Sequence, residues 1–296
     1  MSLVINHNLM AMNAARNLGS AFGDLSTSVR RLSSGLRVST AADDAAGLAV
    51  RELMRSDIAG LNQGIRNAND AISLIQTADG ALSIIDEKLI RMKELAMQAA
   101  TGTYNSDQRL IIDSEYQAMA SEITRIANAT DFNGIYLLNG NLSGSTYSGS
   151  GLQSTGKLLV HFGTGDDSKE DYFYIQIDKA TASSLGVGNE SAQNAGYSVS
   201  TQSAAQQALD AVDAAIVSKD KIRGKLGATQ SRLEGTVTNL EGQADNLTSA
   251  YSQTVDVDVA TEMTEFVRQQ IIAQSATAML AQANVMPRLA LQLLGI

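Results

Sequence analysis

The chain has few of the residues that staple or stiffen a compact globular domain. It contains no cysteine, no tryptophan and a single proline, and only 4% of its 296 residues are aromatic, although 44% are hydrophobic. The lack of cysteine excludes disulfides and thiolate chemistry, and it leaves the redox compartment undetermined. The apolar residues are therefore mainly Ala, Leu, Ile, Val and Met, which favours long helices over a bulky core.

Positive charge and long apolar runs are scarce as well. The formal net charge is −9 and the pI is about 4.7, so no general field attracts nucleic acid or an anionic membrane, and we expect neither as a partner. No stretch approaches the roughly 20 apolar residues that cross a bilayer. Asn6, His7, Asn8 and Asn13 interrupt the first residues, and the first positive charge is Arg16. We therefore expect export, if it occurs, without a cleavable Sec signal.

Both ends of the chain carry an apolar stripe whose members are alternately four and three residues apart. The stripe near the N-terminus consists of Leu18, Phe22, Leu25, Val29, Leu32 and Leu36. The stripe near the C-terminus consists of Ile272, Ala276, Met279, Ala283, Met286, Ala290 and Leu293. Pro287 lacks an N–H and should weaken or bend the second helix. Since a 3.5-residue repeat keeps a narrow stripe facing one partner helix, each end needs a partner: the other end, another copy of the chain, or both.

Capping residues and periodicity place the other helices. Gly35 should close the first helix, and a second apolar pattern runs over about 45–100. Its early stripe consists of Ile58, Leu61, Ile65, Ala68, Ile72 and Ile75, and its later stripe of Leu82, Ile85, Leu89, Met92, Ala96 and Ala99. Ser106 is a plausible N-cap for a third helix that reaches about residue 128, and Asp256 or Asp258 is a good N-cap for the last one. The coarse order is therefore helices, a small sheet and helices again.

The middle of the chain has a different character. Residues 139–157 are rich in Gly, Ser and Asn and lack periodicity, which is typical of a loop. Residues 158–162 and 172–177 are β-branched and aromatic runs around a Gly-Asp-rich turn, which predicts a β-hairpin. A second flexible stretch, 186–200, follows before helical periodicity resumes.

The patterns that could indicate catalysis are weak. Residues 151–157 match the phosphate-loop spacing G-x-x-x-x-G-K, but Leu158 stands where the magnesium-binding hydroxyl belongs and a strand follows instead of a helix. A phosphate-binding hydrolase is therefore a remote alternative. His7 and His161 are the only histidines, and neither has the neighbours of a zinc site or a catalytic triad. We expect no catalytic residue, no cofactor and no metal.

Several motifs in register resemble those of bacterial flagellins. At the N-terminal end they are Val4-Ile5-Asn6, Arg31-Leu-Ser-Ser-Gly-Leu-Arg37, Asp43-Asp44-Ala-Ala-Gly47-Leu48-Ala49 and Phe132-Asn133-Gly134. Further on they are Leu226-Gly227-Ala228 and Leu280-Ala-Gln-Ala-Asn284, followed by Pro287 and a Leu-rich ending. The likeness covers most of residues 1–140 and 200–296.

The resemblance implies a fold and a division into parts. The fold would be mainly α, a long helical hairpin and coiled-coil bundle formed by both chain ends, with a small β-hairpin region in the middle and no large outer domain. The expected parts are a terminal coiled coil in the inner filament layer (1–43 plus 256–296), a helical rod (44–140 plus 201–255), and loops and a β-hairpin packed on the rod (141–200).

The resemblance also implies a function: a structural subunit that polymerises into the flagellar filament, outside the cell. Implied partners are further copies of the chain, the flagellar export apparatus, a secretion chaperone, and the filament cap and hook-junction proteins. A hook-filament junction protein or related axial protein is the alternative. The residues expected to carry assembly are Leu18, Phe22, Leu25, Val29, Leu32, Ile272, Met279, Met286 and Leu293.

One further segment resembles a recognition site. Residues 91–98 (Arg-Met-Lys-Glu-Leu-Ala-Met-Gln) are similar to the flagellin segment bound by the animal Toll-like receptor for flagellin, and Glu115 matches an acidic position on the next helix. Arg91 and Glu115 beside the apolar Leu95 would give the mixture of charge and apolar surface that is common in binding hot spots. The plainer interpretation is that both charges are solvated and that Leu95 borders the core.

Overall fold

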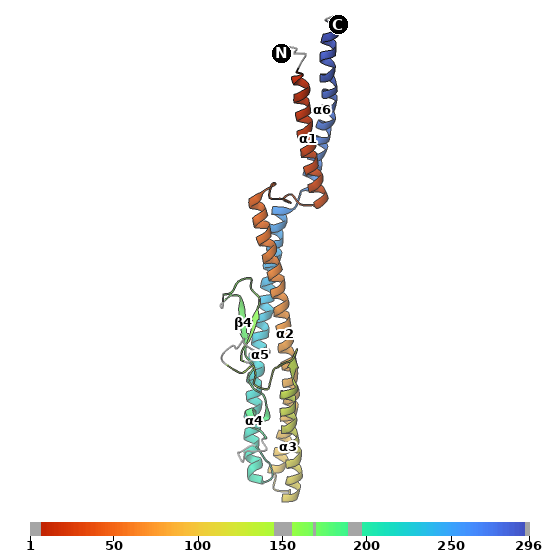
Figure 1. The fold of residues 1–296 in the computed structure, drawn as a ribbon. Helices are drawn as coiled ribbons and strands as arrows, with labels where there is room; N and C mark the ends of the chain where they lie inside the picture. Colours follow the sequence, from red (N-terminus) through yellow and green to blue (C-terminus); the bar gives the residue numbers. More distant parts are fainter. Residues whose placement is uncertain (1–6, 145–155, 168–169, 189–196, 294–296) are drawn as a thin grey trace. The chain divides into compact units, whose positions relative to one another are not determined.

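The computed structural model describes residues 7–144, 156–167, 170–188 and 197–293. These residues form six helices and two small antiparallel strand pairs (Figure 1). In chain order the elements are α1 (Leu9–Ser34), α2 (Ala45–Ala100), α3 (Ser106–Ala129), β1 (Asp131–Phe132), β2 (Ile135–Tyr136), β3 (Leu158–His161), β4 (Tyr172–Ile175), α4 (Ala182–Leu185), α5 (Gln202–Val255) and α6 (Val259–Leu293). The expected mainly α fold with a small β region is confirmed, and the described residues include no large outer domain. Within these same ranges, no helix has both the length and the apolar character needed to cross a membrane.

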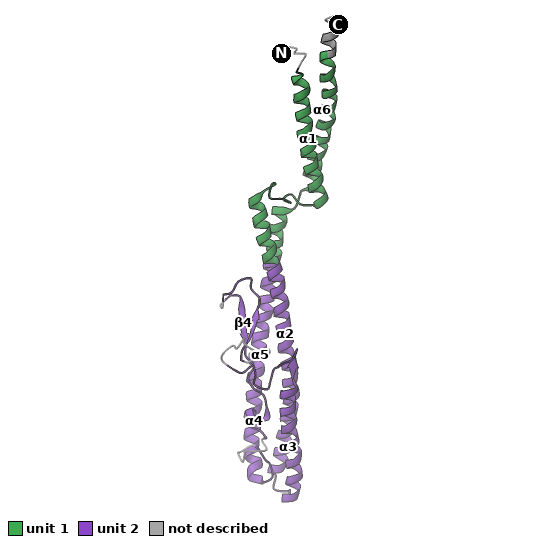
Figure 2. Ribbon diagram, viewed as in Figure 1, with its two compact units in different colours: residues 1–58, 245–296 green, residues 59–244 purple. Residues whose placement is uncertain are grey.

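The chain divides into two compact units (Figure 2). One unit joins residues 1–58 to residues 245–296, and the other consists of residues 59–244. Since α2 runs from Ala45 to Ala100 and α5 from Gln202 to Val255, the boundary between the units falls inside two long helices.

In the first unit, α1 and α6 pack side by side as an antiparallel pair. Asn8 at the start of α1 contacts Ala283, whereas Arg31 near its end contacts Glu262. The residues buried along this pair are small or polar: Ala21, Ser28, Glu262, Gln269, Ala273 and Ala283. The larger apolar side chains of both helices are at most half-buried, so much of their surface is left for other contacts.

Asn8 links the free ends of the two helices. Its side-chain oxygen accepts a hydrogen bond from the Ala11 N–H (3.0 Å), which caps α1, while its Nδ2 donates to the Ala283 carbonyl (2.7 Å). That carbonyl would normally accept from the N–H of residue 287, which is Pro287 and has none. The proline therefore leaves an orphan acceptor that Asn8 satisfies, and α6 continues past it to Leu293.

The helix ends test three capping predictions. Gly35 closes α1 with φ of 72°, in the left-handed region that glycine adopts without strain, as predicted. Asp258 accepts a hydrogen bond from the backbone N–H two residues further on, so its predicted capping role in α6 is confirmed. Ser106 as the cap of α3 is wrong by one residue. Asn105 is the N-cap and forms a reciprocal capping box with Gln108.

In the second unit, the core lies between α2, α3 and α5. The predicted later stripe of α2 is fully buried: Leu82, Ile85, Leu89, Met92, Ala96 and Ala99. Fully buried residues of the other two helices are Tyr116, Ile123, Ala127, Ala205, Ala208, Val212, Ala215 and Leu233. The apolar periodicity of α2 therefore identified the face that packs.

Ion pairs connect α2 and α5 along this core at intervals of seven residues of α2. Asp79 pairs with Arg223 (2.7 Å), Asp86 with Lys219 (2.5 Å), and Lys93 with Asp213 (2.6 Å). The descending numbers on α5 show that the two helices run antiparallel. The Lys219 side chain is only 2% exposed and also contacts Asp220 at 2.7 Å.

The predicted hairpin is present as β3 and β4, which pair antiparallel with Leu158 opposite Ile175 and His161 opposite Tyr172. The Asn67 side chain of α2 donates to the His161 carbonyl (2.8 Å), which anchors the end of β3 to that helix. A Cβ atom at Gly64 would lie only 1.9 Å from the backbone carbonyl oxygen of Phe162. Glycine therefore allows the hairpin backbone to approach α2 this closely.

Candidate self-assembly interface

The predicted assembly residues of the α1–α6 pair whose side chains are described fall into two groups, one half-buried and one exposed. On α1, Leu18, Leu25 and Leu32 are half-buried, whereas Phe22 (52%) and Val29 are exposed. On α6, the three predicted residues whose side chains are described are exposed: Ile272, Met279 (61%) and Met286. Leu293 lies in α6, but its side chain is outside the described residues.

The stripe of α6 that faces α1 is therefore displaced from the predicted one. It consists of Glu262, Gln269, Ala273 and Ala283, with half-buried Ala276 and Leu280 between them. The predicted stripe shares only Ala276 and Ala283 with it. The pair keeps small residues inside and leaves the seven-residue series Ile272, Met279 and Met286 uncovered.

A hollow of about 460 Å³ lies between the two helices near their free ends. Its apolar walls include Met10 of α1 and Ile271, Ile272 and Met279 of α6, and Asn13 and Asn17 supply polar edges. Large apolar side chains gathered on a surface mark a site of protein–protein contact more often than chance. This hollow and the exposed stripes beside it form the candidate interface.

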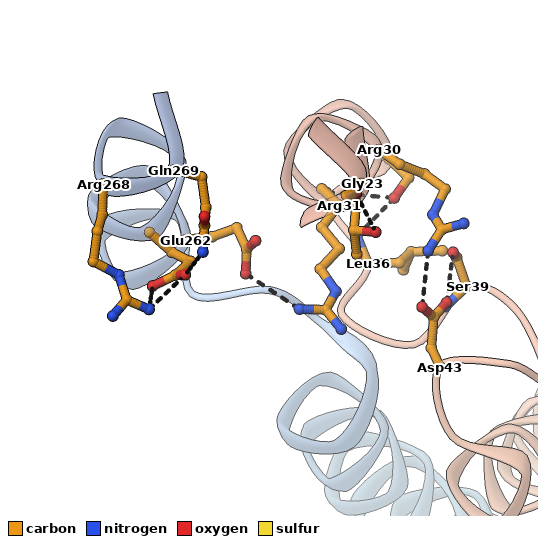
Figure 3. A network of polar contacts seen from close by, with 12 residues as sticks. Gly23, Arg30, Arg31, Leu36, Ser39, Asp43, Glu262, Arg268 and Gln269 are labelled. Atoms are coloured by element: carbon orange, nitrogen blue, oxygen red, sulfur yellow. Dashed lines mark hydrogen bonds and ion pairs between the residues drawn. The ribbon is translucent and has the colours of Figure 1, made fainter. Parts of the chain in front are cut away.

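The other end of the pair carries a layer of polar contacts (Figure 3). Arg31 of α1 faces Glu262 of α6 across 3.6 Å, and Glu262 is only 9% exposed. Gln269, about two helical turns further along the seam, donates to Glu265, which also pairs with Arg268. Of these contacts only the one between Arg31 and Glu262 joins the two helices, so it favours one register of the pair.

This polar layer is not fully satisfied. The Arg31 Nε and the Glu262 Oε1 are buried, and neither has a hydrogen-bond partner among the described residues. Unsatisfied buried polar atoms reduce stability, so the pair contributes less to folding than its burial suggests.

The connector between α1 and α2 is fixed by Asp43. Its carboxylate accepts hydrogen bonds from the hydroxyls and backbone N–H groups of Thr40 and Ser39, and it pairs with Arg30 at 2.8 Å. The Thr40 hydroxyl bond, together with the backbone bonds and the charge of Arg30, lowers the pKa of Asp43 to about 2. Arg37 donates to the carbonyl of Thr254, far along the chain. Arg30 and Arg37 therefore help to hold the connector in place.

The candidate receptor segment is only partly at the surface. Arg91 pairs with Glu115 (2.7 Å) and with Glu94 (2.9 Å), and all three side chains are substantially exposed. Leu95 is 1% exposed. The interpretation of Leu95 as an apolar surface contact is therefore wrong, because its side chain is packed in the core and has no surface to offer.

The described part of the chain does not bring the residues of the weak catalytic patterns together into a site. Most of the 151–157 loop lies outside the described residues; its last residue, Lys157, lies over the ring of Tyr174 at 5.9 Å. A strand follows at Leu158, as expected. His161 lies in β3 beside Tyr172. Across the described ranges, no three His, Asp or Glu side chains converge in a way that could hold a metal ion.

Comparisons with known proteins relate the chain to bacterial flagellins. Residues 5–143 match the family model for the bacterial flagellin N-terminal helical region, and residues 209–294 match that for the C-terminal helical region. The chain is 40% identical to the "Flagellar filament 33 kDa core protein" of Treponema phagedenis, covering 99% of this chain and all of that protein. It is 39% identical to "Flagellin" of Bacillus subtilis, covering 98% of this chain and 99% of the other. The crystal structure of Bacillus cereus flagellin superposes with a TM-score of 0.47 at 28% identity, covering 63% of this chain and 94% of that one.

Proposed function

Because this chain belongs to the bacterial flagellin family and is a structural subunit of the flagellar filament, we propose that its subunits join through the exposed stripes of α1 and α6. Residues 1–43 plus 256–296 then form the inner layer, 44–140 plus 201–255 the rod, and 141–200 the outward-facing loops and hairpin. In this arrangement the chain is an extracellular structural protein and not an enzyme.

The observation that carries the proposal is the placement of large apolar side chains outside the α1–α6 seam. Full burial of a Phe or Met side chain contributes roughly 1.5–3 kcal/mol. Phe22 and Met279 are a little over half exposed, so covering them would add about 1 kcal/mol each. An interface that joins different surfaces of two copies without closing into a ring generates an open helical polymer.

The test places a charge in the proposed contact. Phe22→Asp and Met279→Asp should abolish assembly of purified monomer onto filament seeds, because a buried unpaired carboxylate costs several kcal/mol. Ser20→Asp, on the exposed face of α1 that already carries Asp24, is the matched control and should assemble normally. Sedimentation and electron microscopy measure the outcome. Filaments of normal length from both stripe variants would overturn the proposed contact while leaving the family assignment intact.

Further partners follow from family membership as proposals. The export apparatus, a secretion chaperone, the filament cap and the hook-junction proteins would each meet the terminal helices. Recognition by the animal Toll-like receptor for flagellin would rest on the exposed pair Arg91 and Glu115, without Leu95. A receptor-reporter assay with monomer tests this: Arg91→Ala should reduce signalling, and an undiminished signal would count against the contact.

A further inference from the structure

A second hollow, of about 470 Å³, lies in the unit of residues 59–244, between α5 and the segment that follows β4. Figure 1 shows the short helix α4 of this segment beside α5. Leu185 and Ile222 are buried and form an apolar floor, one from each side. Lys179, Lys221 and Lys225 stand around it with the single carboxylate of Asp178. The hollow therefore combines an apolar floor with a cationic rim.

The concentration of positive charge is unusual for this chain. Three of its eight lysines line one hollow, although the net charge of the chain is −9. Asp178 is engaged by Lys225 at 2.6 Å. Within the described ranges, no carboxylate lies at ion-pair distance from Lys179 or Lys221. Among the residues that the structure describes, Lys179 and Lys221 thus have no ionic partner.

Helix stability does not explain this arrangement. Lys221 and Lys225 are four residues apart on α5, and like charges at this spacing repel each other and destabilise a helix. Elsewhere the same helix places its cations opposite carboxylates, as Lys219 with Asp86 and Arg223 with Asp79 show. An anion held between the lysines would relieve the repulsion.

The walls of the hollow are fixed before any ligand arrives. The Ile177 and Ala180 N–H groups donate to the carbonyls of Leu142 and Leu138, which holds the segment after β4 in place. The Ser184 hydroxyl, on the rim, donates to the Lys179 carbonyl at 2.8 Å and so helps to hold α4 against the backbone of Lys179. Ser218, exposed on α5, adds a second hydroxyl to the rim.

We propose that this hollow binds clustered oxyanions, the phosphate or sulfate groups of a ligand, through Lys179, Lys221 and Lys225. Lysine ammonium groups bind phosphate as point charges, and the Ser218 hydroxyl can donate to a further oxygen. The phosphate or sulfate groups belong either to a small free oxyanion or to an anionic polysaccharide. The site shares no residue with the stripes on α1 and α6, so anion binding would be a further property of the subunit beside filament assembly.

Calorimetric titration of the full-length monomer with inorganic pyrophosphate at low salt tests the site, since salt screens such contacts. Wild-type protein should bind one pyrophosphate saturably, and Lys179→Ala/Lys221→Ala should bind at least tenfold more weakly. The control Lys88→Ala/Lys157→Ala removes the same charge elsewhere in the unit and should bind like wild type. Absence of saturable binding, or equal weakening in both double variants, would overturn the proposal.

A sulfated hexasaccharide in a parallel titration distinguishes the two sources. Tighter binding of the hexasaccharide than of pyrophosphate, lost in Lys179→Ala/Lys221→Ala, assigns the site to polysaccharide; binding of pyrophosphate alone assigns it to a free oxyanion. Circular dichroism and seeded assembly of the same variant should match wild type. A variant that assembles but still binds as tightly as wild type would refute the anion site and leave the filament function standing.

Discussion

The contact between Lys219 and Asp86 makes an asymmetric prediction about stability. The ammonium is 2% exposed and contacts Asp86 at 2.5 Å and Asp220 at 2.7 Å, whereas the Asp86 side chain is 29% exposed and that of Asp220 is 60% exposed. Loss of Asp86 therefore leaves a buried cation with one screened partner. Loss of the lysine leaves a carboxylate that can reach water.

The magnitudes follow from burial. Removal of one partner from a fully buried ion pair costs about 3–5 kcal/mol. Because Asp220 remains, we expect Asp86→Ala to lower the free energy of unfolding by roughly 2–3 kcal/mol. Lys219→Met keeps the volume without the charge and should cost about 1 kcal/mol or less, and the double variant should be close to wild type. At 2–4 °C per kcal/mol for a unit of this size, Asp86→Ala should lower Tm by roughly 5–10 °C.

Thermal melting of the monomer at pH 7, followed by circular dichroism, measures these differences. Asp213→Ala is the control, because its pair with Lys93 is about half exposed on both sides and such pairs contribute at most about 1 kcal/mol. The reasoning is refuted if Lys219→Met destabilises as much as Asp86→Ala, or if the double variant is less stable than Asp86→Ala alone.

Three more substitutions test local contacts. Gly64→Ala should destabilise the hairpin region by about 1–3 kcal/mol in thermal melts, because its Cβ would meet a strand-end carbonyl, whereas Gly80→Ala, with open space around it, should be neutral or stabilising. Asn8→Asp keeps the cap of α1 but loses the donor to the Ala283 carbonyl, so hydrogen exchange in the last turns of α6 should become faster. The same substitution combined with Pro287→Ala should have no such effect, because residue 287 then supplies the N–H that the carbonyl needs. Asp43 has a folded-state pKa of about 2, below its ordinary value of 3.8, so its stabilisation is present above about pH 4 and is lost as pH falls toward 2. In wild type, hydrogen-exchange protection of residues 36–44, measured relative to the intrinsic exchange rate at each pH, should therefore fall between pH 5 and pH 3. Asp43→Asn should remove this pH dependence, and an unchanged pH response would contradict the assignment.

Local signals in the sequence located most of the fold. Periodicity found the buried face of α2, glycine marked the end of α1, and β-branched runs marked the hairpin. Each of these signals depends on residues a few positions apart. Ser106 was misplaced by one residue because Asn105 offers the same capping chemistry.

Contacts between distant segments could not be predicted in this way. The partner of Asn8 is 275 residues away, and its significance depends on the missing N–H of Pro287. The predicted stripe of α6 and the stripe that packs on α1 contain adjacent residues, Ile272 and Ala273, and both repeat with a period that suits a coiled coil. Only the packing shows that α1 contacts the stripe of smaller residues. Leu95 was misjudged for a similar reason, since its neighbours in space are not its neighbours in sequence.

The composition of the α1–α6 seam has a consequence for assembly as proposed above. A pair that joined through Phe22 and Met279 would be more stable alone but would have less apolar surface left for a neighbouring copy. The observed seam does the opposite: alanines and a partly unsatisfied Arg31–Glu262 contact are buried in it, the leucines are only half-buried, and Phe22 and Met279 remain outside. Since the hydrophobic contribution grows with the area removed from water, most of the stabilisation of these helices would arise only when copies meet. The terminal pair would then depend on the polymer for its stability, and polymer growth would draw its free energy from the same side chains.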